Sequence, residues 1–410
     1  MTRDELQQQA IELICTYKRV ALMWATSVGK SFAAIGAARK TKSSRILLLV
    51  AEVEHKKNWE REFNKYASLR GWDMQRETSL TVECYASFKN YENTSWDMII
   101  LDEAHHITSE KRMGVLGTVE AKYFILLSAT LSVQTIWDVS QTIGTIKTSK
   151  VTLEDAINWG IVSKPRIYLI PLALDGISPR ETIVEEWGKK KERRVFRCSF
   201  AERGRYLMLK KDYPNVRLEI SCTQLQKYNY LEQQITYWKQ AYLRGRQEFQ
   251  KNKWMQAGLK RKNMLGEGKT EEVKKLLRGL QNTRFICFCS SISQAEELGQ
   301  NVIHSKKSGN KEVVEKFNEQ MTDNIFAVKM LQEGQNLNGI EAGIIIQLDG
   351  EERSFIQRFG RSLRADDPVQ YIFYYKGTRD EEYLQNALKG IDQQYVRQIK
   401  INQDGSIESK

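Results

Sequence analysis

One short segment combines the residue types that bind a nucleotide phosphate. The apolar run Val20–Trp24 leads into Ala25-Thr26-Ser27-Val28-Gly29-Lys30-Ser31, and a helical pattern follows. A loop of this kind binds phosphate through its backbone N–H groups and the helix N-terminus. Lys30 would neutralise the β- and γ-phosphates of ATP, and the Ser31 hydroxyl would bind Mg²⁺. The predicted nucleotide-binding residues here are Thr26, Ser27, Val28, Gly29, Lys30 and Ser31, although Trp24 stands where the motif usually has its first glycine.

A pair of carboxylates supplies the second half of such a site. The apolar run Met98–Leu101 ends in Asp102-Glu103-Ala104-His105. A phosphate-binding loop needs an acidic pair at the carboxyl end of a neighbouring strand, where Asp102 would hold Mg²⁺ and Glu103 would orient or deprotonate the attacking water. Lys30, Asp102 and Glu103 are therefore predicted catalytic residues, and Ser31 and Asp102 are the predicted Mg²⁺ ligands.

With three further motifs, these residues resemble the superfamily 2 helicases and translocases of the DEAH-box type. Gln7 matches the glutamine that reads adenine, and Leu127-Ser128-Ala129-Thr130 matches the motif that couples hydrolysis to lobe movement. The run Gln357-Arg358-Phe359-Gly360-Arg361-Ser362-Leu363-Arg364 fits the QxxGRxxR pattern, whose last two arginines reach the γ-phosphate. The resemblance implies catalytic roles for Gln357, Arg361 and Arg364, coupling roles for His105, Ser128 and Thr130, and nucleotide contacts for Gln7 and Gly334.

The same resemblance implies where nucleic acid is held. Hydroxyl and backbone N–H groups at strand ends bind phosphates without reading bases. The residues implied here are Ser87, Ser290 and Ser291. The segment Thr152–Ser163 is similar to the branch that contains XPB, restriction-enzyme motor subunits and UvsW-like phage helicases, so a phage origin is one expectation.

The order of apolar runs predicts two α/β lobes, because strands that alternate with helices form parallel sheets. Strands are expected at Val20–Trp24, Arg45–Val50, Met98–Leu101, Phe124–Leu127, Arg166–Ile170, Arg284–Cys289, Ile325–Met330, Gly343–Leu348 and Tyr371–Tyr375. Helices are expected at Ser31–Lys40, Lys56–Tyr66, Leu153–Trp159, Ser293–Gln300, Lys311–Glu319, Ser354–Leu363 and Asp380–Leu388.

The net charge of +12 is concentrated in one block. Residues 181–280 carry 24 basic and 12 acidic side chains, and the remainder of the chain is neutral. A localised excess favours a polyanionic partner, although a solvated surface explains it equally well. Basic clusters interleaved with aromatic rings suit backbone tracking and base stacking. The candidate contacts are Arg193, Arg194, Trp254, Lys260 and Arg261.

We expect an α/β fold with two RecA-like parallel-sheet lobes and a basic helical insertion. The predicted divisions are 1–145 for the ATP-binding lobe 1, 146–180 for a linker and the start of lobe 2, 181–280 for the insertion and 281–400 for the remainder of lobe 2. Neither a separate N-terminal DNA-binding domain nor a nuclease domain is expected.

The expected function is an ATP-dependent DNA helicase or translocase that moves on or remodels single-stranded, duplex or forked DNA, with ATP and Mg²⁺ as cofactors. The alternatives are a motor subunit of a larger restriction or repair complex, an RNA helicase, and an annealing protein with an ancillary ATPase. A monomer is one expectation.

Composition and cysteine use bear on location. No run approaches the 18 apolar residues that suggest a membrane span, so no membrane partner is expected. The six scattered cysteines contain no CxxC pair and indicate reduced thiols, hence a cytoplasmic protein, in the host cytoplasm if phage-encoded. His55 and His304 are expected at the surface.

Overall fold

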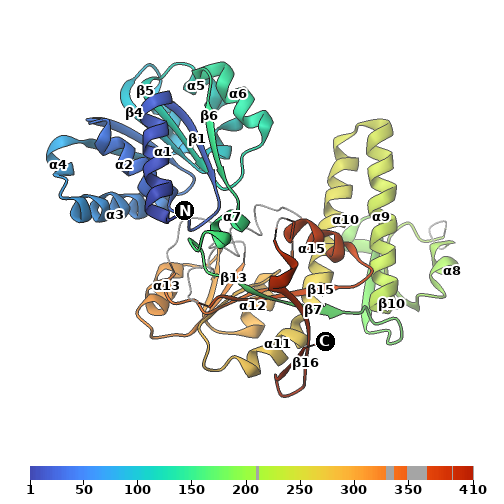
Figure 1. Ribbon diagram of the computed structural model, residues 1–410. Coiled ribbons are helices and arrows are strands. Elements are labelled where there is room, and N and C mark those ends of the chain that lie inside the picture. Colours follow the sequence, from blue (N-terminus) through green and yellow to red (C-terminus); the bar gives the residue numbers. More distant parts are fainter. Residues whose placement is uncertain (209–211, 329–336, 349–366, 390, 410) are drawn as a thin grey trace.

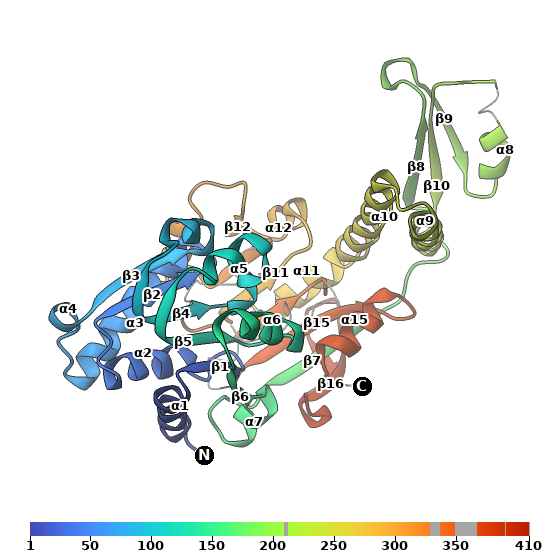
Figure 2. The same ribbon diagram turned by 90° about the horizontal axis from the view of Figure 1, so that it is seen from above.

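A computed structural model describes the chain except residues 209–211, 329–336, 349–366, 390 and 410. It contains two lobes, each built on a sheet with helices packed against it, and an insertion that leaves the second lobe (Figure 1). In Figure 1 the N-terminal lobe, the second lobe and the insertion occupy three separate regions, and in Figure 2, where the two lobes overlap, the insertion still stands apart.

Lobe 1 is a six-stranded sheet of order β3-β2-β4-β5-β1-β6, and every strand pair in it is parallel. Its strands are β1 (Arg19–Trp24), β2 (Arg45–Val50), β3 (Ser79–Cys84), β4 (Ser95–Asp102), β5 (Glu120–Ser128) and β6 (Lys147–Val151). Its helices are α1 (Arg3–Tyr17), α2 (Lys30–Lys40), α3 (Val53–Arg70), α4 (Met74–Glu77), α5 (Glu110–Leu116) and α6 (Val133–Ile143), with 3-10 turns η1 (Tyr85–Tyr91) and η2 (Ala104–Thr108). The four central strands are those that the apolar runs predicted, because strands covered on both faces need continuous apolar sequence.

The two edge strands of this sheet were not predicted. β3 is mostly half-buried and β6 is mostly exposed, and their sequences SLTVEC and KTSKV contain no apolar run. β6 pairs with β1 in parallel register, so it belongs to lobe 1. Lobe 1 therefore extends to Val151, beyond the expected boundary at residue 145.

Lobe 2 is an eight-stranded sheet of order β12-β13-β11-β14-β15-β7-β16-β17, parallel except for the β16–β17 pair. Its strands are β7 (Arg166–Leu172), β11 (Phe285–Phe288), β12 (Val302–His304), β13 (Asn324–Val328), β14 (Ala342–Ile345), β15 (Val369–Tyr375), β16 (Val396–Ile401) and β17 (Ile407–Ser409). Its helices are α11 (Thr270–Gly279), α12 (Ile292–Leu298), α13 (Asn310–Asn318) and α15 (Arg379–Ala387), with the turn η5 (Gln393–Tyr395). α7 (Leu153–Asn158) connects the two lobes. The expected helix at Ser354–Leu363 lies outside the described residues.

The chain enters lobe 2 through β7, leaves it for the insertion and returns at α11. Val273 and Leu276 of α11 are fully buried in the core of lobe 2 together with Ile170 and Phe285. The insertion therefore ends near Glu267, earlier than the expected residue 280.

The insertion is only half helical, which corrects the expectation of a helical block. It begins with a small sheet of order β8-β10-β9, formed by β8 (Glu181–Trp187), β9 (Arg194–Ser199) and β10 (Val216–Cys222), with the turn η3 (Lys190–Glu192) and helix α8 (Arg203–Leu207). A hairpin of α9 (Gln224–Gly245) and α10 (Glu248–Glu267) follows. The burial of β10 follows the apolar/polar alternation of its sequence VRLEISC, a strand signal that the prediction of a helical block passed over. Figure 2 shows the small sheet beyond the hairpin, on the side away from lobe 1.

A buried ion pair fixes the base of the insertion to lobe 2. Lys269 Nζ lies 2.7 Å from Asp380 Oδ2, and both side chains are at most 1% exposed. The Lys269 ammonium also donates to Ile346 O and to Gln347 Oε1, each at 2.8 Å, and Gln347 Nε2 donates to Asp380 Oδ1 at 2.7 Å. A buried charge needs such a complete set of partners.

Within the described part of the chain, no helix is both long and apolar enough to cross a membrane.

Candidate functional site

The predicted phosphate-binding loop joins β1 to α2. Ser27 and Gly29 adopt left-handed backbone conformations, with φ of 65° and 102°, and α2 begins at Lys30. Gly29 is the N-cap of α2, and a side chain there would place Cβ 2.3 Å from Gln7 Nε2. Gln7 itself donates to Gly29 O at 3.4 Å. α1 therefore brings Gln7, which the resemblance assigned to the adenine base, directly against the loop, and the positive φ of Gly29 favours glycine there.

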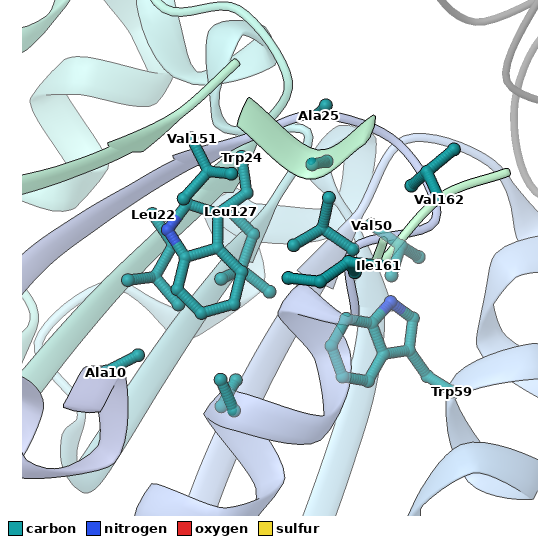
Figure 3. Packing of buried hydrophobic residues seen from close by; sticks show 14 of the residues in the cluster. Ala10, Leu22, Trp24, Ala25, Val50, Trp59, Leu127, Val151, Ile161 and Val162 are labelled. Atoms are coloured by element: carbon teal, nitrogen blue, oxygen red, sulfur yellow. The ribbon is translucent and has the colours of Figure 1, made fainter. Parts of the chain in front are cut away.

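Trp24 shows why the loop tolerates the loss of its usual first glycine. Its side chain is fully buried, and its indole N–H donates to Ser149 Oγ on β6 at 3.0 Å. In Figure 3 the ring packs among Leu22, Leu127 and Val151. Because the indole lies in the core below the sheet end, it leaves the loop backbone clear.

Lys30 is half-buried, and its charge acts on the acidic pair. Its ammonium donates to Trp24 O at 2.7 Å and to Ala25 O at 3.3 Å. Burial lowers the pKa of Lys30, and the charges of Glu103 and Asp102 oppose that shift. The ammonium is therefore held inside the loop, where its charge acts on the two carboxylates that sequence analysis assigned to Mg²⁺ and water.

The acidic pair lies where β4 ends. Glu103 has a left-handed conformation with φ of 45°, a rare geometry for a residue with a side chain, and its N–H donates to Asp102 Oδ1 at 3.1 Å. Burial raises the pKa of Asp102, while a hydrogen bond from Trp59 and the charges of His55 and Lys30 oppose the rise. The two carboxylates thus occupy different environments next to one loop.

Trp59 was not predicted as a functional residue. Its indole Nε1 donates to Asp102 Oδ2 at 2.7 Å, and the side chain is 4% exposed. Figure 3 shows its ring on α3, across from Ala25 and Val50 at the strand ends. Trp59 belongs to the apolar stripe that it shares with Phe63, and the sequence contains no signal that its N–H points at a carboxylate. Tyr85, two residues before the expected phosphate contact Ser87, also holds this strand end, because its hydroxyl donates to Asp102 O at 2.8 Å.

Two of the histidines are buried, although the sequence predicted them at the surface. His105 Nδ1 lies 3.4 Å from Glu103 Oε2, so the expected coupling residue contacts the carboxylate that the sequence predicted to be catalytic. His55 and His304 were expected at the surface, but they are 4% and 7% exposed. His304 Nδ1 accepts a hydrogen bond from Lys306 N at 3.2 Å, and His55 lies near Asp102.

Ser128 and Thr130 form a tight turn where β5 ends. The Ser128 hydroxyl donates to Thr130 O at 2.9 Å, and Thr130 N donates back to Ser128 Oγ at 3.2 Å. Because β5 lies between β4 and β1, this turn is beside both the acidic pair and the phosphate-binding loop.

The residues at these strand ends fit a nucleotide with Mg²⁺. Thr26 Oγ1 is buried and has no hydrogen-bond partner among the residues that the structure describes, so the loop contains a polar group of the kind that a ligand satisfies. Ser31 and Asp102 are oxygen donors, which Mg²⁺ prefers. Lys30 and the loop N–H groups would hold the phosphates, and Mg²⁺ would supply charge neutralisation between the β- and γ-phosphates. The predicted residues Gly334, Gln357, Arg361 and Arg364 lie outside the described residues.

The predicted phosphate contacts on the lobes take part in local hydrogen bonds. Ser290 Oγ donates to Gln294 Oε1 at 2.8 Å, and Ser291 caps α12 by accepting from Gln294 N at 3.2 Å. Ser87 is half-buried in η1, beside Glu83. All three lie just after strands of their sheets.

The insertion candidates differ in how accessible they are. Arg261 is 8% exposed; it pairs with Glu232 on α9 and donates to Tyr383 OH of α15 at 3.2 Å. Its guanidinium is therefore part of the internal structure of the insertion. The prediction that Arg261 belongs to an exposed basic cluster that contacts nucleic acid is wrong. Arg193 bonds Glu186 Oε2 at 2.7 Å.

The remaining insertion candidates lie nearer the surface. Trp254 is half-buried beside Tyr242, whereas Arg194 and Lys260 are exposed.

Two family descriptions match the chain in the regions that these sites occupy. Residues 1–133 match the res subunit of type III restriction enzymes, and residues 268–366 match the helicase conserved C-terminal domain. These two domains together characterise the ATP-hydrolysing helicases of superfamily 2. The chain is a superfamily 2 helicase. The second match begins at residue 268, in agreement with the packing of α11 on lobe 2.

Solved structures share the fold of this helicase. The DNA-bound type ISP restriction-modification enzyme LlaBIII matches 96% of the chain at 13% identity with a TM-score of 0.54, and the chain spans 30% of that enzyme. The helicase domain of Hef from Pyrococcus furiosus matches over 94% of the chain and 97% of its own length, at 15% identity and a TM-score of 0.50. Dbp5 from S. cerevisiae, bound to RNA and ADP BeF3, matches over 96% and 88%, at 12% identity and a TM-score of 0.54. The expected pair of RecA-like lobes is thereby confirmed. No curated protein matches the sequence.

Proposed function

We propose that this helicase hydrolyses ATP with Mg²⁺ and uses the cycle to translocate on DNA. The observation that carries the proposal is the arrangement around Lys30, whose ammonium is held by the Trp24 and Ala25 carbonyls at the end of β1, while Asp102 and Glu103 follow β4 two strands away in the same sheet. In the proposed cycle Lys30 exchanges its bonds to the Trp24 and Ala25 carbonyls for the β- and γ-phosphates.

Each residue of the pair has a separate task in hydrolysis. Asp102 binds Mg²⁺ through a carboxylate that Trp59 and the Glu103 N–H hold in place. Glu103 takes the proton from the attacking water, and His105 contacts Glu103. In-line attack on the γ-phosphate needs this positioning more than it needs covalent chemistry.

Stepping follows from the division of the site between the lobes. We assign the γ-phosphate contact of lobe 2 to Arg361 and Arg364, so that hydrolysis is fast only when the lobes close. Arginines in this role contribute about 10³- to 10⁵-fold in rate. When the lobes alternately close and open, the nucleic-acid contacts on each lobe move in turn along a strand.

DNA is the proposed substrate, and the first match to a restriction enzyme bound to DNA supports it. An RNA helicase remains the second candidate, because the similarly folded Dbp5 structure contains RNA. The LlaBIII match covers one part of a larger enzyme, which favours a motor subunit of a restriction or repair complex as the third. We place the activity in the cytoplasm, of a host cell for a phage-encoded chain, and all six cysteines are thiols rather than disulfides, which supports this.

The deciding experiment measures ATP hydrolysis by the purified chain alone and with single-stranded, duplex and forked DNA or RNA. DNA translocation predicts stimulation by DNA of at least one form and a smaller effect of RNA. Stimulation by RNA alone would establish the second candidate. A rate that no nucleic acid changes would contradict both.

A further inference from the structure

The insertion contains a groove that the nucleotide site does not use. A hollow of about 1050 Å³ lies between β8 and the α9–α10 hairpin. Its lining includes six basic side chains and three acidic ones, so the groove is net positive. The hydrophobic cores that hold the small sheet and the base of the hairpin are separate, and the groove runs between them.

On the β8 wall both glutamates are paired with arginines. Glu185 is held by Arg203 at 2.6 Å, and Glu186 by Arg193 at 2.7 Å and Arg217 at 2.9 Å. Because each glutamate already has an arginine, this wall does not repel an anion. Its arginines keep further N–H groups for a ligand, since a guanidinium has five donors.

The hairpin wall carries the uncompensated charge. Lys253 and Lys260 line the groove from α10, and no ion pair to either is recorded among the described residues. They are two helical turns apart, about 10 Å along the axis. Gln256, Asn263 and, from α9, Gln234 lie along the same wall, and the acidic Glu267 lies at its far end.

An aromatic ring completes the lining. Trp238 on α9 is half-buried and forms part of the groove wall. Tyr237 and Phe249 approach its ring edge-on, with centroids 5.0 and 6.3 Å away, so the indole is supported from the side. Aromatic rings beside ammonium and amide donors are typical of sites for unpaired nucleotides, where a base stacks and the backbone is neutralised.

We propose that this groove binds one unpaired strand of nucleic acid, with phosphates on Lys253 and Lys260 and a base on Trp238. The inference rests on the proposed function and adds a second strand site, distant from the path across the lobes. A single strand is favoured over a duplex because the volume resembles that of pockets of about 300–1,000 Å³, which enclose small ligands, and accommodates only a few nucleotides. The protein therefore holds two strands of a branched substrate at once.

The test compares two double variants of equal charge. Lys253→Glu with Lys260→Glu reverses the groove wall, and Lys239→Glu with Lys251→Glu makes the same change on the hairpin outside the groove lining. Binding of a short fluorescein-labelled oligodeoxythymidine and of a fork is titrated at three salt concentrations. Each lost phosphate contact on a single strand lowers the salt slope by about 0.7. We expect the groove variant to lower it by about 1.4 for the fork, and the control variant by much less.

A second measurement locates the strand. A fork with a photoreactive thymine analogue in one arm is irradiated, and the cross-linked peptide is identified. We expect it to contain Trp238, and Trp238→Leu to lose the cross-link while basal ATP hydrolysis stays unchanged.

Two results would overturn the groove as a nucleic-acid site while leaving the proposed function intact. The first is an equal salt slope in both double variants. The second is that the groove variant loses binding of a strand-forming acidic peptide along β8 but still binds nucleic acid normally. A wild-type chain that binds no nucleic acid would overturn the proposed function as well, so the two failures are distinguishable.

Discussion

Replacing Trp59 with phenylalanine isolates the hydrogen bond that holds the proposed Mg²⁺ ligand. The substitution removes the donor 2.7 Å from Asp102 Oδ2 and keeps an aromatic ring in a site that is 4% exposed. A hydrogen bond to a charged group contributes about 1.5–3 kcal/mol. Partners that orient a metal ligand typically contribute 10- to 100-fold in affinity. We therefore expect the Mg²⁺ concentration for half-maximal hydrolysis to rise about 10- to 100-fold.

The pH dependence should change in the same variant. Burial already raises the pKa of Asp102, and the Trp59 hydrogen bond opposes the rise. Without that bond the pKa rises further, so the carboxyl becomes protonated at a higher pH. A neutral carboxyl is a poor Mg²⁺ ligand. The fall of activity on the acid side should accordingly begin at higher pH in Trp59→Phe, and excess Mg²⁺ should move it back.

Trp72→Phe is the matched control. Trp72 is also buried on lobe 1, packs on the same Phe63 as Trp59, and donates to a carboxylate, Glu77 Oε2, at 3.1 Å. The Trp72→Phe substitution creates a similar cavity away from the proposed nucleotide site. The assay is ATP hydrolysis over a Mg²⁺ titration at several pH values, with thermal unfolding of each variant. If both variants show the same Mg²⁺ requirement, Trp59 only fills space and the reasoning is refuted.

Three further predictions concern the site and its support. Glu103→Gln should retain ATP binding and lose turnover, because the Mg²⁺ ligand remains while the base is gone; normal turnover would show that the assignment is wrong. Arg361→Ala and Arg364→Ala should each slow hydrolysis about 10³-fold or more with nucleotide binding preserved. Nucleotide binding is measured by stopped flow and hydrolysis under single-turnover conditions, and normal single-turnover rates in both variants would contradict the assignment. Lys269→Met should destabilise lobe 2 by about 3–5 kcal/mol, because it leaves Asp380 buried without its cation; denaturant unfolding should show partial recovery in Lys269→Met with Asp380→Asn, and no recovery would argue against a charge effect.

The sequence predicted what depends on continuous apolar runs and on motifs. β2 and the core of β4 were found because strands buried on both faces are apolar throughout. Edge strands such as β6 were missed, since half-exposed positions accept any polar residue. The loop at Gly29 and the pair at Asp102 were predicted at strand ends of one sheet, because phosphate and Mg²⁺ chemistry demands those residue types in that context, and the structure places both there.

Contacts between distant segments could not be predicted. Arg261 belonged to a basic cluster in sequence, but its partner Glu232 lies on the preceding helix, and burial of the pair depends on how the hairpin packs. Trp59 had the spacing of a core residue, and the direction of its N–H depends on where β4 ends. Charge and hydropathy patterns describe which face a residue occupies, whereas its partner is decided by tertiary packing.

The anchoring of the insertion links the two proposed strand sites mechanically. Lys269 lies two residues beyond the end of α10 and pairs with Asp380 on α15, and Tyr375 OH donates to Gly268 O at 2.8 Å. Rigid buried pairs of this kind resist bending at the junction, because separating them would expose an uncompensated charge to the core. The groove should then move with lobe 2 as one unit. When ATP closes the lobes, a strand in the groove would be displaced relative to the strand held by lobe 1, and that relative displacement is what the separation or remodelling of a fork requires.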